Sequence, residues 1–406
     1  MTFQMMPALF LVLAAAPLSP ALLSAAQCEA RHCTFVEELS AGRAGRVVHL
    51  SLPTSDAYSR PCEPQEWWLV GAGKAAPVLI LRACNDGYGA AGMGEDMVTV
   101  SGTRLTHARS GGSNWRWGST RTVELSPPGL VSEQHVSFHT STPNRQTTRD
   151  FDWRAFTFTT TVALPGCGPS GVAVEGGEVP LTDVASHDIP QVALPVAFRE
   201  GGWKTTPLGS CSASGSFSIS GAPGPASDAS LRVVSAPPDE LYVEVTDDRF
   251  LDNEAKWLFG DHLELWLPRA NSLPSDFDRC LGKRGAGAWQ WAIDLNEKAR
   301  VTPAAGAPGV KLEAQVVREG NVARAKLKLP PGDWYAVTVV FSDSDDGKAQ
   351  KQLISTSQLR FNQAATLGGF RALQPRQAAC EVGPAGLSPR SGQQVTAAEP
   401  ILSEVF

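Results

Sequence analysis

The chain has 406 residues and a formal net charge of −6, with 35 basic and 41 acidic side chains interspersed along it. No basic stripe occurs, which removes the main electrostatic argument for nucleic-acid binding. The length predicts two domains, with three as the alternative, and 38 glycines and 30 prolines predict many turns between short elements.

The N-terminal segment 1–26 is apolar, is broken by Pro17 and Pro20 and ends in three small residues. This pattern predicts a secretory signal cleaved after Ala26, and therefore a secreted or periplasmic protein. The segment is too short and too broken to span a bilayer, and no later stretch is apolar enough, so no transmembrane segment is expected. The alternatives are a buried N-terminal helix and lipidation at Cys28, which Gln27 disfavours because a small residue is expected there.

Eight cysteines, an even number in an exported chain, predict disulfides. Cys62 and Cys84 lie symmetrically about Gly73, inside the turn-like GAGKAAP between EWWLV and VLILRAC. A hairpin there would place the two cysteines opposite each other, so we expect them to pair. No CxxC or Cys/His spacing suggests zinc. Cys380 is expected to attach the C-terminal tail to the body of the protein.

Helical periodicity is almost absent, and short runs of Val, Leu, Phe, Trp and Thr recur between turn residues. The chain is therefore predicted to be all-β, with two antiparallel β-sandwich-like domains. The first domain is expected over 27–165, a connector with one strand over 166–195, the second domain over 196–371, and a tail without periodicity over 372–406.

Tryptophans of the first domain are interpreted mainly as core residues, although together they would also suit a ligand groove. In NWRW, alternation places Trp115 and Trp117 on one side of a strand and Arg116 on the other. The tryptophans concerned are Trp67, Trp68, Trp115, Trp117 and Trp153.

His135 and His139 in EQHVSFHT lie on one side of a strand, with Ser137 between them. A metal pair is conceivable, but no third ligand is evident in the sequence. Two surface histidines are the preferred interpretation.

Two strand-like runs of the second domain, LYVEV and HLELWL, alternate between apolar and polar residues. The apolar sets, expected to form the core, are Leu241, Val243 and Val245 in the first run and Leu263, Leu265 and Leu267 in the second. The opposite sides carry Tyr242, Glu244 and Thr246, and His262, Glu264 and Trp266.

If these runs pair as neighbouring strands, their polar sides form one outward surface. An aromatic ring beside carboxylates suits a sugar, because a pyranose face stacks on the ring while its hydroxyl groups bond the acids. The alternative is that Trp266 covers the sheet beneath a loop and the carboxylates only solvate an exposed side.

LYVEVTDDRF, then GDHLELWL, and later AKLKLPPGDWYAVTVVFSDSDDG resemble carbohydrate-binding module family 9 and related DOMON-like β-sandwiches over 196–371. The resemblance implies a two-sheet antiparallel sandwich that binds sugar ends and often holds structural calcium. That family grips sugar between two tryptophans, and no pair here matches with assurance. The candidates are Trp257, Trp266, Trp289 and Trp291, of which the last two are expected in the core.

Aspartates lie at the facing ends of the two strand-like runs and at the end of the later one, which predicts a calcium site, because hard cations bind several carboxylate oxygens. The predicted ligands are Asp247, Asp248, Asp261, Asp343, Asp345 and Asp346. The DSDDG segment is not an EF-hand loop, since its glycine comes one place early and Ile354 replaces the bidentate Glu. A solvated Asp-Gly turn is the alternative. If the fold brings aspartates of the first two runs (Asp247, Asp248, Asp261) near those of the later run (Asp343, Asp345, Asp346), their combined charge would be hard to hold without an ion.

No nucleophile elbow, zinc-protease helix, P-loop, kinase or paired-cysteine motif occurs in the sequence. We therefore predict an exported, non-catalytic protein that binds carbohydrate or a cell-envelope glycan through Tyr242, Glu244, Trp257, His262, Glu264 and Trp266. One alternative is a polysaccharide hydrolase with a C-terminal binding module, because a catalytic carboxylate pair is set by fold and not by spacing. The other is a cell-envelope protein-interaction module.

Overall fold

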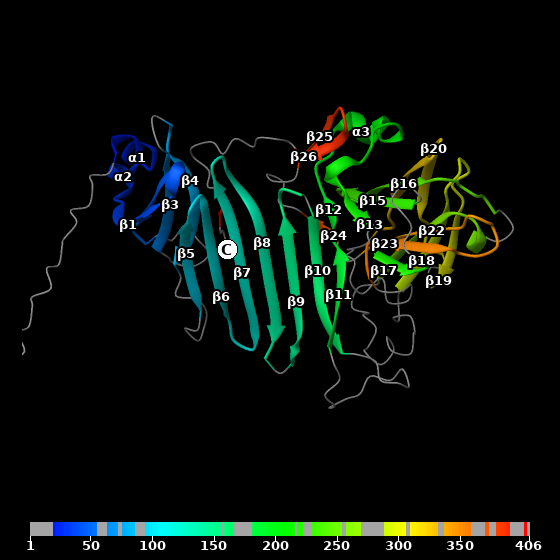
Figure 1. Ribbon diagram of the computed structural model, residues 1–406, viewed down its shortest axis with the longest axis horizontal. Coiled ribbons are helices and arrows are strands. Elements are labelled where there is room, and N and C mark those ends of the chain that lie inside the picture. The colour runs from blue at the N-terminus through cyan, green and yellow to red at the C-terminus, as the bar shows by residue number, and fades with distance from the viewer. Residues whose placement is uncertain are drawn as a thin grey trace, which may run out of the picture.

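The computed structural model of the chain describes residues 19–54, 63–71, 75–85, 94–140, 142–155, 157–165, 181–215, 217–221, 229–253, 257–268, 288–305, 309–331, 337–358, 370–372, 379–389 and 402–403. This part of the chain is mostly strand, which confirms the predicted all-β fold (Figure 1). Its helices are short: α1 (Pro20–Ala25), α2 (Cys28–Arg31) and α3 (Val196–Glu200), with 3-10 turns η1 (Gly42–Ala44), η2 (Gly202–Lys204), η3 (Gly209–Cys211) and η4 (Trp257–Phe259). No described helix is long and apolar enough to cross a membrane.

Two sheets form the first half of the described chain. The first sheet has the order β1-β2-β3-β4-β27, with β1 (Thr34–Ser40), β2 (Gly45–Ser51), β3 (Glu63–Gly71), β4 (Val78–Asn85) and β27 (Leu402–Ser403). The second sheet is antiparallel in the order β11-β10-β9-β8-β7-β6-β5. Its strands are β5 (Glu95–Ser101), β6 (Arg104–Gly112), β7 (Trp115–Leu125), β8 (Pro128–His139), β9 (Thr142–Asp152), β10 (Thr157–Pro165) and β11 (Leu181–His187).

The first two sheets pack against each other over only part of the second sheet. Apolar side chains of the first sheet, such as Trp67 and Ile80, meet Leu105, Val123 and Leu125 of the second sheet in a buried core. The other face of the first sheet buries Trp68 beneath α1 and α2. Both of these tryptophans are therefore core residues, as predicted.

The second half of the described chain is a sandwich of two more sheets. The third sheet has the order β20-β21-β16-β15-β12-β24, with β13 paired to β15. Its strands are β12 (Ile189–Gln191), β13 (Ala213–Gly215), β15 (Ala229–Ala236), β16 (Glu240–Asp247), β20 (Glu313–Glu319), β21 (Val322–Lys328) and β24 (Phe370–Ala372). The fourth sheet has the order β14-β23-β22-β17-β18-β19. Its strands are β14 (Phe217–Ser220), β17 (His262–Pro268), β18 (Ala288–Asp294), β19 (Val301–Ala305), β22 (Thr338–Asp343) and β23 (Gln352–Ser355).

The core of this sandwich contains all six residues that alternation assigned to it, each at most 2 % exposed: Leu241, Val243, Val245, Leu263, Leu265 and Leu267. Trp291 is buried in the same core and Trp289 packs against it, also as predicted.

The predicted pairing of the two runs is wrong. β16 pairs with β15 and β21 in the third sheet, whereas β17 pairs with β18 and β22 in the fourth. The two strands face each other across the core, so their polar sides point in opposite directions. Alternation fixes which side of a strand is buried, but it does not fix which strands pair.

The two halves are joined by strands and by a disulfide. Residues 181–191, inside the predicted one-strand connector, form both β11 and β12, which extend the second and third sheets respectively. A small core joins Phe151 and Phe158 of the second sheet to residues of the sandwich. Cys211 and Cys380 form a disulfide that attaches the hairpin of β25 (Cys380–Gly383) and β26 (Gly386–Pro389), as expected for Cys380.

The N-terminal part described packs on the first sheet. Leu22 and Ala26 are fully buried there, and Cys28 forms a disulfide with Cys33. Cleavage after Ala26 stays a prediction, and lipidation of Cys28 stays the less favoured alternative. The predicted Cys62–Cys84 pairing lies outside the described residues.

Candidate functional site

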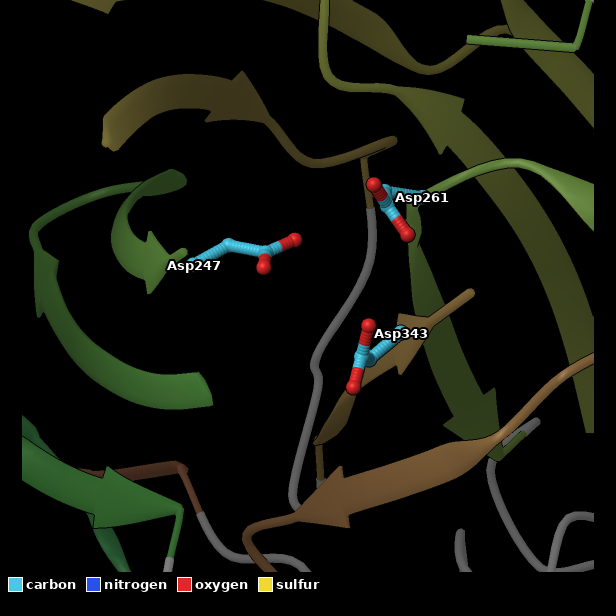
Figure 2. A group of neighbouring side chains, drawn as sticks. All are labelled: Asp247, Asp261 and Asp343. Carbon is cyan, nitrogen blue, oxygen red and sulfur yellow. The ribbon is translucent and has the colours of Figure 1, made fainter. Parts of the chain in front are cut away.

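Three buried aspartates meet at one end of the sandwich. Asp247 ends β16 in the third sheet, Asp261 precedes β17, and Asp343 ends β22 in the fourth sheet. Each contributes a carboxylate oxygen, and these oxygens all lie within 4.8 Å of one another. Figure 2 shows the three side chains extending toward a common space. We call these three residues the aspartate cluster. Sequence spacing alone could not show that aspartates of the first two runs meet an aspartate of the later one.

Backbone groups hold the central member of the cluster. Asp261 accepts hydrogen bonds from the backbone N–H of Ser344 at 2.7 Å and from that of Leu251. The residue before it has to be glycine, because a Cβ on Gly260 would lie 2.7 Å from the backbone nitrogen of Asn253. The Gly-Asp pair of the sequence is thus explained by a close approach of two loops, which aims the Asp261 carboxylate into the cluster.

The cluster resists full ionisation. The pKa of Asp261 is raised to about 8, first by burial, while the backbone N–H of Leu251 acts in the opposite direction. The neighbouring Asp247 and Asp343 carboxylates raise it further. A low-dielectric site with three acids close together disfavours a second and third negative charge.

The donor set suits a hard divalent cation. Carboxylate oxygens are the preferred ligands of calcium, which accepts six to eight oxygens in a flexible arrangement. Magnesium demands a near-octahedral shell and retains several waters, so three convergent carboxylates fit calcium better. An ion bound by Asp247, Asp261 and Asp343 would link the third sheet to the fourth.

The other three predicted metal ligands lie outside the cluster. Asp248, next to Asp247, is exposed. Asp345 forms an ion pair with Lys351, and Asp346 accepts a hydrogen bond from the backbone N–H of Lys348 at 2.8 Å in an exposed turn. Asp345 and Asp346 therefore fit the alternative, the solvated Asp-Gly turn.

The predicted sugar surface does not form, because its members lie on two outer faces and are covered. On the third sheet, the Tyr242 side chain is 1 % exposed, packs on Phe198 of α3 and donates a hydrogen bond to Glu240 at 2.8 Å. Burial, followed by the Glu240 carboxylate, raises the pKa of the Tyr242 hydroxyl. Glu244 forms an ion pair with Arg324 at 2.8 Å.

On the fourth sheet, Trp266, Glu264 and His262 are each at most 1 % exposed. Glu264 accepts hydrogen bonds from the Trp266 indole and the Gln290 amide, both at 3.0 Å. Trp266 is thus buried, and its indole N–H is hydrogen-bonded to Glu264 on the same strand. This agrees with the alternative interpretation, in which Trp266 is covered and not available to a sugar. Trp257 lies in η4, and its side chain is outside the described part of the structure.

An exposed aromatic surface lies instead on the second sheet, where the sequence interpretation favoured core. The Trp115 side chain is 67 % exposed and that of Trp117 is 37 % exposed. Trp115 pairs with His139 of β8, and Trp117 pairs with Ser137. Both rings therefore lie on the face of the second sheet that packs against the first sheet at Val123. The first sheet covers that end of the face only. The sequence does contain a signal for this exposure. Residues 113–119, which include the start of β7, have no aliphatic side chain, whereas the packed end of β7 has Val123 and Leu125.

A hollow of about 280 Å³ adjoins Trp117 on this face. Its described lining is Trp117, Gly118, His135, Val136, Ser137, Thr147 and Arg149. We call this region, together with Trp115, the tryptophan face. His135 packs edge-on to Phe151 and His139 edge-on to Trp115, so the two histidines are held by different aromatic rings. Among the described residues neither histidine belongs to a group of potential metal ligands.

No family model matches this chain, and no curated protein matches it either. The resemblance to carbohydrate-binding module family 9 therefore stays a prediction from short motifs.

Proposed function

We propose that this chain is an exported, non-catalytic carbohydrate-binding protein whose second-half sandwich is held together by a calcium ion. The observation that carries the calcium part is the aspartate cluster, in which three buried carboxylates from two sheets lie within 4.8 Å of one another. Carboxylates buried close together repel one another, and their oxygens are the ligands that calcium prefers, so a cation suits this arrangement.

The carbohydrate part is supported by the tryptophan face. On this face of the second sheet, the large hydrophobic side chains that are described and exposed are both indole rings, Trp115 and Trp117. Exposed, flat aromatic rings beside hydroxyl, imidazole and guanidinium groups suit a sugar, which has C–H faces that stack on a ring and hydroxyl groups that form hydrogen bonds. The ligand site thus moves from the sandwich surface expected from sequence to the second sheet.

Export is supported by the two described disulfides, Cys28–Cys33 and Cys211–Cys380. Disulfides form and persist in oxidising compartments outside the cytoplasm, where calcium is also available for binding.

The other two functions have less support. A hydrolase needs a pair of carboxylates at its cleft, and the described lining of the hollow beside Trp117 has no acidic side chain. A protein-interaction module is favoured by an exposed apolar patch poor in rings, whereas this surface is built from tryptophan.

Two measurements test the proposal. Protein treated with a chelator is unfolded thermally alone, with calcium and with magnesium; calcium is expected to raise the midpoint more than magnesium does. The same protein is then run in native gels that contain soluble polysaccharides, with albumin as the reference, and at least one glycan should retard it. Retention by no glycan would overturn carbohydrate binding, and equal midpoints with and without calcium would overturn the cation site.

A further inference from the structure

We propose that a pocket between the two halves of the molecule binds a small hydroxylated anion, whose carboxylate or phosphate group is held by Arg232. We call it the junction pocket. Its lining includes Thr157, Phe158 and His187 of the second sheet on one side, and Ser210, Ser214 and Arg232 of the second half of the chain on the other. It shares no described residue with the tryptophan face and goes beyond the carbohydrate binding proposed above.

The junction pocket has the size and the position of a small-molecule site. Its volume of about 350 Å³ lies within the roughly 300–1,000 Å³ typical of such sites, which often form where domains meet. It lies between strands β10 and β11 of the second sheet and the elements η3, β13 and β15 of the second half. The volume suits a ligand with a single sugar-sized ring.

The wall formed by η3 is fixed in place. Cys211 at its end is joined by a disulfide to Cys380 of the β25–β26 hairpin. Gly209 at its start has a φ of +52°, and a Cβ there would overlap the backbone carbonyl of Leu387 in that hairpin. A wall held in this way needs little reordering when a ligand binds, which lowers the entropic cost of binding.

The facing wall is packed by aromatic rings. Phe158 is 2 % exposed, and its ring meets that of Phe151 edge-on, with centroids 5.5 Å apart. His187 stacks on Phe217 with centroids 4.9 Å apart, and burial lowers the pKa of its imidazole. Near neutral pH His187 is therefore mostly uncharged, and the positive charge of the described lining comes from Arg232.

Arg232 presents a positioned guanidinium to the pocket. Its side chain is exposed, and its Nη1 donates a hydrogen bond to the Gly209 carbonyl at 3.1 Å. A guanidinium has five N–H donors in a planar fork, so this one bond orients the group and leaves other donors for a ligand. Among the residues that the structure describes, no carboxylate forms an ion pair with Arg232.

The carboxylate that lies beside Arg232 in the strand register has another partner. Glu244 of β16 lies between Arg232 of β15 and Arg324 of β21, and it forms its ion pair with Arg324 at 2.8 Å. Two guanidinium groups thus share one carboxylate, and the described lining of the pocket adds no acidic side chain. The remaining positive charge favours an anion, because a guanidinium binds a carboxylate or phosphate through two parallel hydrogen bonds.

Hydroxyl groups extend the recognition to both walls. Thr157 at the start of β10 is exposed on one side, and Ser210 and Ser214 are exposed on the other. Each hydroxyl can donate one hydrogen bond and accept others, so the three groups suit a ligand that carries hydroxyl groups of its own. A hydroxylated anion therefore fits the lining better than a bare inorganic ion does.

Calorimetric titration of the full chain at pH 7 tests the proposal. The ligands are galacturonate and glucose 6-phosphate, their neutral counterparts galactose and glucose, and inorganic phosphate as the bare anion. The variants are Arg232→Gln, which removes the charge, and Thr157→Ala, which removes a hydroxyl from the facing wall. Arg43→Gln is the matched control, because Arg43 is exposed in η1 on the first sheet. Unfolding midpoints confirm that each variant is folded.

At least one of the two hydroxylated anions should bind the wild type more tightly than its neutral counterpart does. Arg232→Gln should weaken that binding by about tenfold to hundredfold, the loss expected for a bond to a charged group, and Thr157→Ala by about threefold to tenfold. Arg43→Gln should match the wild type.

Binding of neither anion, or binding that Arg232→Gln leaves unchanged, would overturn the proposal. Equal affinity for the anions and the neutral sugars would overturn the role of charge, and inorganic phosphate that binds as tightly as glucose 6-phosphate would overturn the role of the hydroxyl groups. Glycan retention by the tryptophan face is measured separately, so the failure of one site is distinguishable from the failure of the other.

Discussion

Asp247→Asn is the most informative single change in the aspartate cluster, with the adjacent Asp248→Asn as its matched control. Asp247 is 1 % exposed, whereas Asp248 is exposed. The Asp247 carboxylate accepts a hydrogen bond from the backbone N–H of Arg249 at 3.0 Å. An asparagine keeps an oxygen for that bond, so the substitution removes charge and leaves local geometry in place.

Without a cation, the variant should be more stable than the wild type. Two ionised carboxylates whose oxygens lie within 4.8 Å of each other repel each other by about 3 kcal/mol or more at an effective dielectric constant of about 20. Near neutral pH Asp261 is mostly protonated, because its pKa is about 8, and the Asp247 carboxylate is one of the charges that raise it. Removing one of these charges should therefore stabilise the chelated protein by about 1–3 kcal/mol.

With calcium the comparison changes in the other direction. At 1 mM calcium, a site with a dissociation constant of about 10 μM stabilises the wild type by about 2.7 kcal/mol. If losing one ligand weakens binding a hundredfold, the variant gains only about 0.4 kcal/mol. Those gains correspond to midpoint increases of roughly 5–10 °C for the wild type and about 1 °C for the variant.

Differential scanning calorimetry of the three proteins, with chelator and with calcium, measures these midpoints. Asp248→Asn should behave like the wild type in both conditions. Equal calcium-induced increases for Asp247→Asn and the wild type would refute the reasoning, and so would a large loss of stability in the chelated variant.

When calcium is removed with a chelator, the free energy of unfolding should fall as the pH rises from about 4 to about 8. The reason is that the unfolded chain releases the Asp261 proton near the ordinary pKa of 3.8, whereas the folded chain keeps it up to about 8. Urea titrations at pH 5 and pH 8.5 check this, and a rise in the free energy of unfolding would contradict it. Replacing Cys211 and Cys380 together by alanine should cost about 2–5 kcal/mol, since the disulfide closes a loop with a sequence separation of 169; an unchanged urea midpoint would argue against it. Gly111→Val should displace the Trp117 ring, shift the tryptophan fluorescence and weaken glycan retention, and an unaltered spectrum would show that the ring does not lie on that glycine.

The sequence was sufficient to predict the all-β fold and the core side of the strands β16 and β17. Alternation is a local property, so Leu241 and Val243 in one run, and Leu263 and Leu265 in another, could be assigned to the interior without knowing the topology. Pairing is not local. The 14 residues 248–261 are long enough to bridge the roughly 10 Å between two packed sheets as well as to form a hairpin, and the structure uses them as a bridge.

The candidate site was predictable only in part for the same reason. Six aspartates carried the same strand-end signal, but only Asp247, Asp261 and Asp343 lie where the two sheets meet at one end of the sandwich. The tryptophans show the converse problem. Trp67 and Trp117 both lie on strands, and what separates them is whether another sheet covers that part of the face, which depends on contacts between distant segments.

The most direct test of the central claim is to locate the ion. Crystals of the chelated protein, soaked in calcium or a heavier lanthanide substitute, would give an anomalous difference map. The structure predicts a peak between the aspartate cluster carboxylates, with cation–oxygen distances of about 2.3–2.6 Å for calcium. A map without a peak there, with the three side chains unchanged and an ion bound elsewhere, would contradict the account.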